Sequence, residues 1–217
     1  MEHKDIRYIA IEGNIGVGKT SLARMLAERL KARLILEQFE QNPFLPKFYE
    51  DPKHYAFQTQ MFFLLSRYRQ QQEFVQADLF HNYVISDYIF EKDKIFAHVT
   101  LQDDELSLYD SMIALMERNI PVPDLVVYLQ SSIDRLLKNI KVRNRSMEQT
   151  MSEEYLKTLN EAYNYFFFRY KTTPLLIVKT TDIDFVNNPD DFEELLDQIL
   201  RPSKAPIEYY NPRTKRA

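Results

Sequence analysis

Residues 13–20 read Gly13-Asn14-Ile15-Gly16-Val17-Gly18-Lys19-Thr20, which has the spacing G-x-x-x-x-G-K-T. The apolar run 8–11 precedes this stretch, and apolar residues recur at helical spacing through 21–30. A strand, a glycine-rich turn and a helix in this order are the context of a phosphate-binding loop. Successive backbone N–H groups of such a loop surround phosphate oxygens at the start of the helix. We therefore expect all of residues 13–20 to bind a nucleoside triphosphate, with Lys19 on the β- and γ-phosphates and the Thr20 hydroxyl on Mg²⁺.

The distribution of glycine supports this interpretation. The chain has 3 glycines, and all of them lie in this stretch, at Gly13, Gly16 and Gly18. Glycine permits positive φ angles and a close approach of backbone to ligand. An ordinary glycine-rich turn is the alternative, but the Lys-Thr ending and the preceding strand favour phosphate binding.

Length and composition narrow the classes of protein. A chain of 217 residues with 45% hydrophobic residues predicts one α/β domain with a substantial core. A formal net charge of −4 argues against a general nucleic-acid binder. Because cysteine is absent, disulfides and thiolate metal sites are excluded. The charged N-terminus is no signal peptide, and no apolar run reaches membrane-spanning length, so we expect a cytoplasmic protein without a membrane partner.

Strands and helices alternate along the chain. We expect five strands, at 8–11, 34–36, 83–86, 124–129 and 175–178, and helices at 21–30, 54–80, 101–118, 132–142, 151–170 and 189–200, with a short helix between 42 and 52. This order predicts a parallel five-stranded sheet with helices on both faces, a three-layer fold whose ligand lies beyond the carboxyl ends of the strands. We assign residues 1–200 to this single domain and 201–217 to a partly disordered tail.

Two acidic residues follow predicted strands at the edge that carries the phosphate loop. Glu37 ends the second strand and is a candidate general base for a hydroxyl that attacks the γ-phosphate. Its alternatives are a ligand of a Mg²⁺-bound water or a helix-capping acid. Asp87 ends the third strand, where it is either a Mg²⁺ partner of Thr20 or a helix N-cap.

The predicted helix 54–80 carries polar side chains two turns apart on one face. These are Gln60 and Arg67. The Gln60 amide offers a donor and an acceptor and suits the edge of a nucleobase, whereas Arg67 could orient Glu37 or neutralise charge. The aromatic residues around them are more often core than a base-stacking platform. Gln58 lies off this face and is expected at the surface.

A basic segment follows the predicted helix 132–142. Arg143 and Arg145 lie here, and arginines on a closing loop stabilise charge on a transferred phosphoryl group. A solvated basic helix end is the alternative. Because the phosphate loop is present, we expect these two residues to form an arginine lid.

From residue 9 to about 200 the chain resembles the deoxynucleoside kinase family. The resemblance rests on the stretches 11–22 (IEGNIGVGKTSL), Glu37 with 42–45 (NPFL), 57–67 (FQTQMFFLLSR), 124–130 (DLVVYLQ), the Arg-Asn-Arg of the lid and 153–163 (EEYLKTLNEAY). The first stretch is common to many ATPases, but the set together is specific.

The resemblance implies that ATP or another triphosphate phosphorylates the 5′-hydroxyl of a deoxynucleoside, with a purine or broad base preference. By resemblance, Glu37 is the catalytic base, Gln60 bonds the nucleobase, and Arg143 and Arg145 are lid arginines. Arg67 matches an arginine further along the nucleobase helix. The segment 181–185, with Asp184 and Phe185, resembles a loop that touches the adenine of the phosphate donor. The family also implies a homodimer joined through helices, for which 54–80 and 101–118 are candidates.

One departure concerns the segment after the third strand, where the family usually carries an acid, then arginine, then serine. This chain reads Ser86-Asp87-Tyr88 and lacks that arginine. We expect Asp87 to take the acidic role, because a metal-bound triphosphate requires a carboxylate near Thr20. Either another cation, Arg67 or Lys92, replaces the arginine, or transfer is impaired.

Two further interpretations stay open at this point. A nucleoside monophosphate kinase of the thymidylate kinase type would need a cationic acceptor site and no general base, and Glu37 argues against it. The second interpretation is a nucleotide-binding module that does not transfer a phosphoryl group, and the missing family arginine keeps this interpretation open.

Overall fold

The computed structural model describes residues 6–74, 81–145, 148, 151–201 and 205–212. Its centre is a six-stranded sheet in the order β2-β3-β1-β4-β5-β6, with every neighbouring pair parallel. Ile9 lies in register with Ile85 on one side and with Leu125 on the other. The strands are β1 (Tyr8–Gly13), β2 (Arg33–Ile35), β3 (Val84–Ser86), β4 (Leu125–Gln130), β5 (Leu175–Lys179) and β6 (Ile207–Tyr210).

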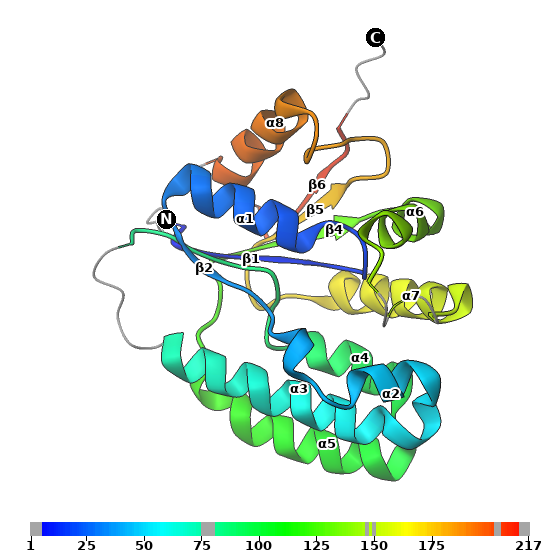
Figure 1. Ribbon diagram of the computed structural model, residues 1–217. Helices are drawn as coiled ribbons and strands as arrows, with labels where there is room; N and C mark the ends of the chain where they lie inside the picture. Colours follow the sequence, from blue (N-terminus) through cyan, green and yellow to red (C-terminus); the bar gives the residue numbers. More distant parts are fainter. Residues whose placement is uncertain (1–5, 75–80, 146–147, 149–150, 202–204, 213–217) are drawn as a thin grey trace.

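Helices cover both faces of this sheet (Figure 1). The α-helices are α1 (Lys19–Leu30), α2 (Leu45–Glu50), α3 (Pro52–Phe74), α4 (Lys92–Thr100), α5 (Asp103–Met116), α6 (Ile133–Arg143), α7 (Glu153–Arg169) and α8 (Pro189–Leu200). Helices α1 and α8 lie over one face, α4 and α7 over the other, and α3 and α5 form a further layer outside α4 (Figure 1). None of the helices in the described ranges is long and apolar enough to cross a bilayer.

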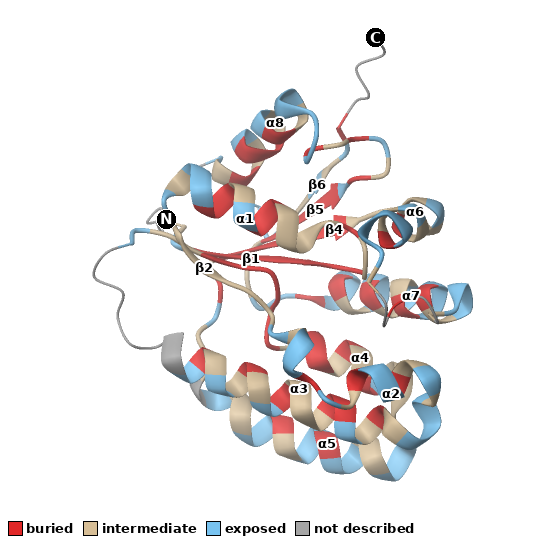
Figure 2. Ribbon diagram, viewed as in Figure 1, coloured by how far each residue is buried: buried red, intermediate tan, exposed pale blue. Residues whose placement is uncertain are grey.

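Successive side chains of a strand point to opposite faces of the sheet, and this alternation explains the layers. Ile9 and Ile11 of β1 are buried in the cluster that contains α1, α6 and α8, whereas Tyr8 and Ala10 are buried in the cluster that contains α4 and α7. Both faces of β1 and β4 are therefore buried, as Figure 2 shows. A parallel sheet covered on both sides requires such continuous apolar strands.

The structure corrects the predicted strand count from five to six. Strand β6 lies within the segment assigned to a tail and pairs with β5, with Ile207 beside Leu175 and Tyr210 beside Val178. The strand was missed because it is a four-residue edge strand whose residues alternate between exposed and half-buried. Residues 202–204 and 213–217 of the predicted tail lie outside the described part of the chain.

The helices largely follow the predicted ranges. Helix α8 has the predicted bounds, and α3 begins two residues earlier than expected, at Pro52. The predicted extension of α3 through 75–80 lies outside the described residues. Helix α4 was not predicted, and it proves to carry two of the charged side chains of the site described next.

Candidate active site

The phosphate loop connects β1 to α1 at the carboxyl edge of the sheet. Gly16 and Gly18 have φ angles of 83° and 103°, in a region that residues with side chains rarely adopt. A Cβ on Gly18 would lie 2.9 Å from the Phe185 ring, and one on Gly16 would lie 2.9 Å from the Leu136 carbonyl oxygen. Conformation and space therefore both require glycine at these two positions.

Other residues of the loop hold it in place. The Asn14 side chain donates a 3.1 Å hydrogen bond to the Leu156 carbonyl of α7, and its oxygen accepts a 2.7 Å bond from the Ile15 N–H. Val17 is buried in the core below the loop, whereas Ile15 faces the cavity described below. The N–H groups of Gly13, Ile15 and Val17 are therefore used within the loop or just before it, and the loop is fixed from beneath.

Lys19 folds back across the loop. Its Nζ donates hydrogen bonds to the carbonyl oxygens of Gly13, at 2.7 Å, and Asn14, at 3.1 Å. Burial and the positive charge of Lys92 lower the pKa of Lys19 to about 8. Two ammonium groups therefore act on each other at this loop, so an anion bound between them would be stabilised by both.

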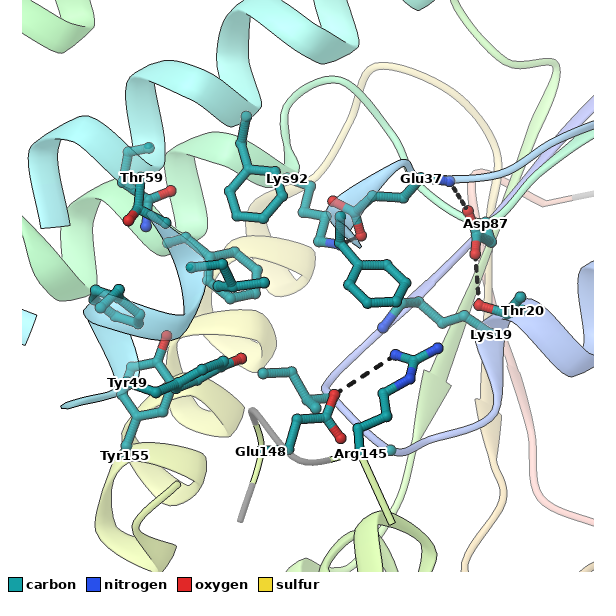
Figure 3. Close-up of a pocket in the computed structure, with 18 of the residues that line it drawn as sticks. Lys19, Thr20, Glu37, Tyr49, Thr59, Asp87, Lys92, Arg145, Glu148 and Tyr155 are labelled. Carbon is teal, nitrogen blue, oxygen red and sulfur yellow. Dashed lines mark hydrogen bonds and ion pairs between the residues drawn. The ribbon is translucent and has the colours of Figure 1, made fainter. Parts of the chain in front are cut away.

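Asp87 connects the loop to the strand that carries the candidate base. Its Oδ2 accepts a 2.6 Å hydrogen bond from the Thr20 hydroxyl, and its Oδ1 accepts a 2.8 Å bond from the Glu37 backbone N–H (Figure 3). Asp87 does not cap a helix, because α4 begins at Lys92. A hydroxyl and a carboxylate side by side are oxygen donors of the kind Mg²⁺ prefers. Among the described residues there is no group of three His, Cys, Asp or Glu that could hold a metal ion.

Glu37 lies two residues beyond β2, between two cations. Its Oε2 accepts a 2.5 Å bond from Lys92 Nζ, and its Oε1 contacts the Arg67 guanidinium. Burial alone would raise the pKa of the Glu37 carboxyl, but the charges of Arg67 and Lys92 outweigh burial and hold the pKa well below its usual range. Glu37 is therefore ionised.

Arg67 joins three elements of the fold. One terminal nitrogen contacts Glu37 and the other contacts Asp93 of α4, and its side chain is only 3% exposed. The two carboxylates raise the pKa of Arg67 against the effect of burial. Arg67 thus contacts the Glu37 carboxylate directly, and its predicted roles, to orient Glu37 or to neutralise charge, stay predictions.

Polar atoms without partners mark the opposite end of the cavity. The Gln60 amide donates through Nε2 to Thr100 Oγ1 at 3.3 Å, whereas Gln60 Oε1 and Thr59 Oγ1 are buried with no hydrogen-bond partner in the described structure. The Thr100 hydroxyl donates its own hydrogen to the Phe96 carbonyl at 2.8 Å, so it can only accept from Gln60. Buried polar atoms are normally satisfied, so this end is suited to a ligand with a hydrogen-bonding edge.

One cavity connects these groups (Figure 3). Lys19, Thr20 and Asp87 lie on one side of it, and Thr59, Tyr49 and Tyr155 lie on the other. Its apolar lining includes Ile15, Phe39, Leu45, Phe48, Phe63 and Phe96. A ligand with a flat apolar ring, polar edges and a reactive end near the phosphate loop would fit such a site.

Comparison with known proteins decides the family. The family described as "Deoxynucleoside kinase" matches residues 9–202. The chain belongs to the deoxynucleoside kinase family. It is therefore a kinase that phosphorylates deoxynucleosides, with a nucleotide as phosphate donor.

Individual relatives cover most of this kinase. A deoxyguanosine kinase of Bacillus subtilis is 38% identical over 193 residues, which are 87% of this chain and 93% of the relative. A deoxyadenosine/deoxycytidine kinase of the same organism is 30% identical, with coverage of 88% and 90%. A solved deoxyadenosine kinase from M. mycoides with bound dATP superimposes with a TM-score of 0.78 at 26% identity, covering 88% of this chain and 98% of that one.

The kinase brings most of the residues singled out from its sequence to one cavity. Glu37, Gln60, Arg67 and Asp87 all line it together with Lys19 and Thr20. Gln58 is exposed on α3, as expected, and Phe63 of the aromatic set faces the cavity, with the Arg67 guanidinium 4.9 Å from its ring centroid.

The two arginines that were predicted to form a lid, Arg143 and Arg145, also line this cavity. Arg143 Nη2 donates 2.6 Å bonds to both carboxylate oxygens of Glu148, and Arg145 lies 3.6 Å from the same carboxylate. The Arg145 guanidinium also stacks 4.1 Å from the Phe39 ring centroid. The Glu148 carboxylate thus contacts both arginines in the cavity that also contains Lys19 and Thr20. The phosphates of a bound nucleotide would compete with Glu148 for these arginines.

Asp184 and Phe185 line a second cavity on the other side of the phosphate loop, together with Arg135 and Asn187. The Asn187 side chain donates to both Asp184 oxygens, at 3.1 and 3.0 Å, and Arg135 lies 3.8 Å away. Phe185 is buried against Gly18. Phe185 therefore shapes the loop itself, and the Asp184 carboxylate is partly occupied by its own neighbours.

Several residues in and beside the cavity carry no signal in the sequence. Asp93, which contacts Arg67 without lining the cavity, is not among the predicted residues, and Lys92 is predicted only as a possible replacement for the family arginine; both lie on the unpredicted α4. Tyr88, at the position after Asp87, is buried, and its hydroxyl donates to Gln70 at 3.1 Å, so it supplies no cation to the site. Tyr49 and Glu148 carried no local motif that would have marked them.

Proposed function

We propose that this kinase transfers the γ-phosphoryl group of ATP to the 5′-hydroxyl of a purine deoxynucleoside, with nucleotide salvage as its role. The observation that carries the proposal is the ionised Glu37 carboxylate, held across one cavity from the phosphate loop and from the unpartnered Gln60 amide oxygen. That geometry supports a sugar hydroxyl at Glu37 and a base at Gln60.

In the proposed reaction, Glu37 takes the proton from the 5′-hydroxyl while that oxygen forms a bond to the γ-phosphorus. The bond from the γ-phosphorus to the bridging oxygen breaks, and ADP leaves. Lys19 and the lid arginines Arg143 and Arg145 stabilise the negative charge on the phosphates. Bound Mg²⁺, with Thr20 and Asp87 as its protein partners, would neutralise charge on the triphosphate.

Gln60 is the proposed reader of the base. Its orientation follows from Thr100, which accepts from the amide nitrogen, so the amide oxygen is left as an acceptor for an N–H group of the ligand. The names of the relatives, which include deoxyguanosine and deoxyadenosine kinases, favour a purine. On the donor side, we assign the adenine of ATP to the cavity with Asp184 and Phe185.

The experiment that tests this function is a substrate panel. The purified protein is incubated with ATP, Mg²⁺ and each of the four common deoxynucleosides in turn, and ADP formation is measured. We expect ADP with a deoxyguanosine or deoxyadenosine acceptor and weaker formation with pyrimidines. Formation of ADP only when a deoxynucleoside monophosphate is supplied would indicate a monophosphate kinase and overturn the proposal, as would no acceptor-dependent ADP at all.

We also propose that the kinase is a homodimer joined through α3 and α5, in the cytoplasm where ATP is supplied. Leu65 on α3 and Leu108 and Leu115 on α5 are 39%, 53% and 70% exposed. The two α5 leucines lie seven residues apart and share one helix face. Light scattering after size-exclusion chromatography should give twice the monomer mass, and Leu115→Glu should reduce it; a monomeric wild type would refute the dimer.

A further inference from the structure

Lys92 is the most deeply placed cation of the cavity that is not locked by a second carboxylate. It is the first residue of α4, and its side chain is 6% exposed. Its Nζ donates to Glu37 Oε2 at 2.5 Å and lies 5.5 Å from the centroid of the Phe96 ring. An ammonium group has three N–H donors, so one bond to a carboxylate leaves capacity for a second oxygen ligand.

Lys92 and Lys19 line one cavity and lie close enough for their charges to interact. After burial, the charge of Lys92 is the largest influence on the pKa of Lys19, and it lowers that pKa. Both ammonium groups line the same cavity, together with Thr20. Two cations that repel each other across a cavity bind an anion between them favourably, because that anion removes the repulsion.

Arg67 is the other candidate cation beside Glu37, but two carboxylates hold it, whereas Lys92 pairs with one. Its two terminal nitrogens each contact one carboxylate, Glu37 and Asp93, which hold the guanidinium in place between them. Withdrawing Arg67 would leave Asp93 as a buried, unpaired carboxylate, which is costly. Among the described residues Lys92 forms an ion pair with one carboxylate, Glu37, and its charge also acts on the buried Glu12 carboxylate. Its remaining N–H donors are therefore open to a further anion.

We propose that Lys92 is a catalytic residue that binds the transferred phosphoryl group from the acceptor side, facing Lys19 on the donor side. The inference rests on the proposed function, in which the 5′-hydroxyl gives its proton to Glu37. As that proton moves, the negative charge beside Lys92 passes from Glu37 to the oxygens around phosphorus. Lys92 lies where it stabilises the charge before and after this shift, and a fixed cation at the site of developing charge favours the transition state.

The first test compares Lys92→Gln with Lys94→Gln. Lys94 is two residues along the same helix and pairs at 2.5 Å with Glu117, away from the cavity. We expect Lys92→Gln to lower kcat by about 10²–10³-fold with little change in the KM of ATP, because one charge-stabilising group is lost. Lys94→Gln should keep kcat. A kcat of Lys92→Gln within threefold of wild type would overturn the proposal while leaving the proposed function intact.

A second test separates charge from packing and uses the absence of cysteine in this chain. The Lys92→Cys variant has one thiol, so alkylation with bromoethylamine installs a lysine-like ammonium at this position alone. If the buried thiol does not react in the folded protein, the unfolded chain is alkylated and then refolded. Alkylation with iodoacetamide installs a neutral group of similar length. We expect activity to return with the first reagent only. Equal activity after both treatments would overturn the role of the charge. A folded protein that stays inactive after alkylation with bromoethylamine would also overturn it.

A third measurement reports contact with the phosphoryl group itself. Aluminium fluoride with ADP and a deoxynucleoside mimics the anionic group in transfer. The wild-type protein should bind ADP and the deoxynucleoside more tightly when aluminium fluoride is present than when it is absent. The Lys92→Gln variant should lose this increase in affinity while it still binds ATP. An undiminished increase would show that Lys92 acts only through Glu37. If wild type itself forms no ADP with any deoxynucleoside, the proposed function fails first, and the failure is recognised before any variant is made.

Discussion

The Asp87 carboxylate accepts a 2.8 Å hydrogen bond from the backbone N–H of Glu37. Its other oxygen takes the Thr20 hydroxyl at 2.6 Å. A single buried carboxylate therefore fixes the distance between the phosphate loop, which follows β1, and the candidate base, which follows β2. Because these elements are separated by the length of α1, neither could position the other through local structure.

Glu37→Gln should leave ATP binding unchanged and lower kcat by about 10²–10⁴-fold, since glutamine keeps the shape but cannot accept the hydroxyl proton. Steady-state ADP formation and calorimetric titration with ATP would measure the two effects. Turnover within a few-fold of wild type would show that another group removes the proton.

Asp87→Asn should raise the Mg²⁺ concentration required for half-maximal activity by about tenfold. The amide has one acceptor oxygen instead of two, so it cannot satisfy the Thr20 hydroxyl and the Glu37 N–H and also serve a cation. A Mg²⁺ titration at fixed ATP measures this change, with Thr20→Ser as a variant that keeps the hydroxyl. An unchanged titration curve would argue against Asp87 as a metal partner.

Gln60→Leu should lower kcat/KM for the deoxynucleoside by about 10–100-fold and leave the KM of ATP unchanged, because a hydrogen bond to a buried base edge is worth about 1.5–3 kcal/mol when its loss leaves a polar group unpaired. Gln58→Leu is the matched control, since Gln58 is exposed on the same helix. Equal effects of both substitutions would mean that the helix, and not the amide, is responsible.

Gly18→Ala should destabilise the protein by at least about 1–2 kcal/mol, the cost of a side chain in a left-handed conformation, and should abolish the thermal stabilisation given by ATP. The φ angle of 103° and the Phe185 ring 2.9 Å from the added Cβ are separate causes. Adding Phe185→Leu relieves the contact alone, so the double variant should stay unstable if backbone strain dominates. Thermal unfolding with and without ATP provides the measurement.

A chain that ends at Leu200 should unfold several degrees below one that ends at Pro212. The shorter chain lacks β6, which pairs with β5, and also lacks the Pro206 carbonyl, which accepts a 3.0 Å hydrogen bond from the Leu175 N–H. The longer chain keeps β6 and serves as the control. Equal midpoints of thermal unfolding would show that the sixth strand contributes no stability.

Prediction from sequence succeeded where the signal is local. Helix α8 has the predicted bounds, and the structure shows a local signal at its start, where Pro189 opens the helix and the Asn188 side chain accepts from the Asp190 N–H at 3.1 Å. Helix α4 carries no such signal: Glu91 precedes it in a helical conformation without a side-chain cap. It was therefore missed, and with it the placement of Lys92 and Asp93.

The sequence by itself determined the phosphate loop, the strands buried on both faces and the two-turn spacing of Gln60 and Arg67. Each of these depends on neighbours within one or two turns of chain, where residue type and spacing set the geometry. Only the tertiary structure decided that β6 completes the sheet, that Asp87 bridges Thr20 and Glu37, and that Lys92 lies in the cavity with Lys19. These relationships join segments far apart in the chain, and burial and electrostatic pairing, which no local pattern encodes, bring them together.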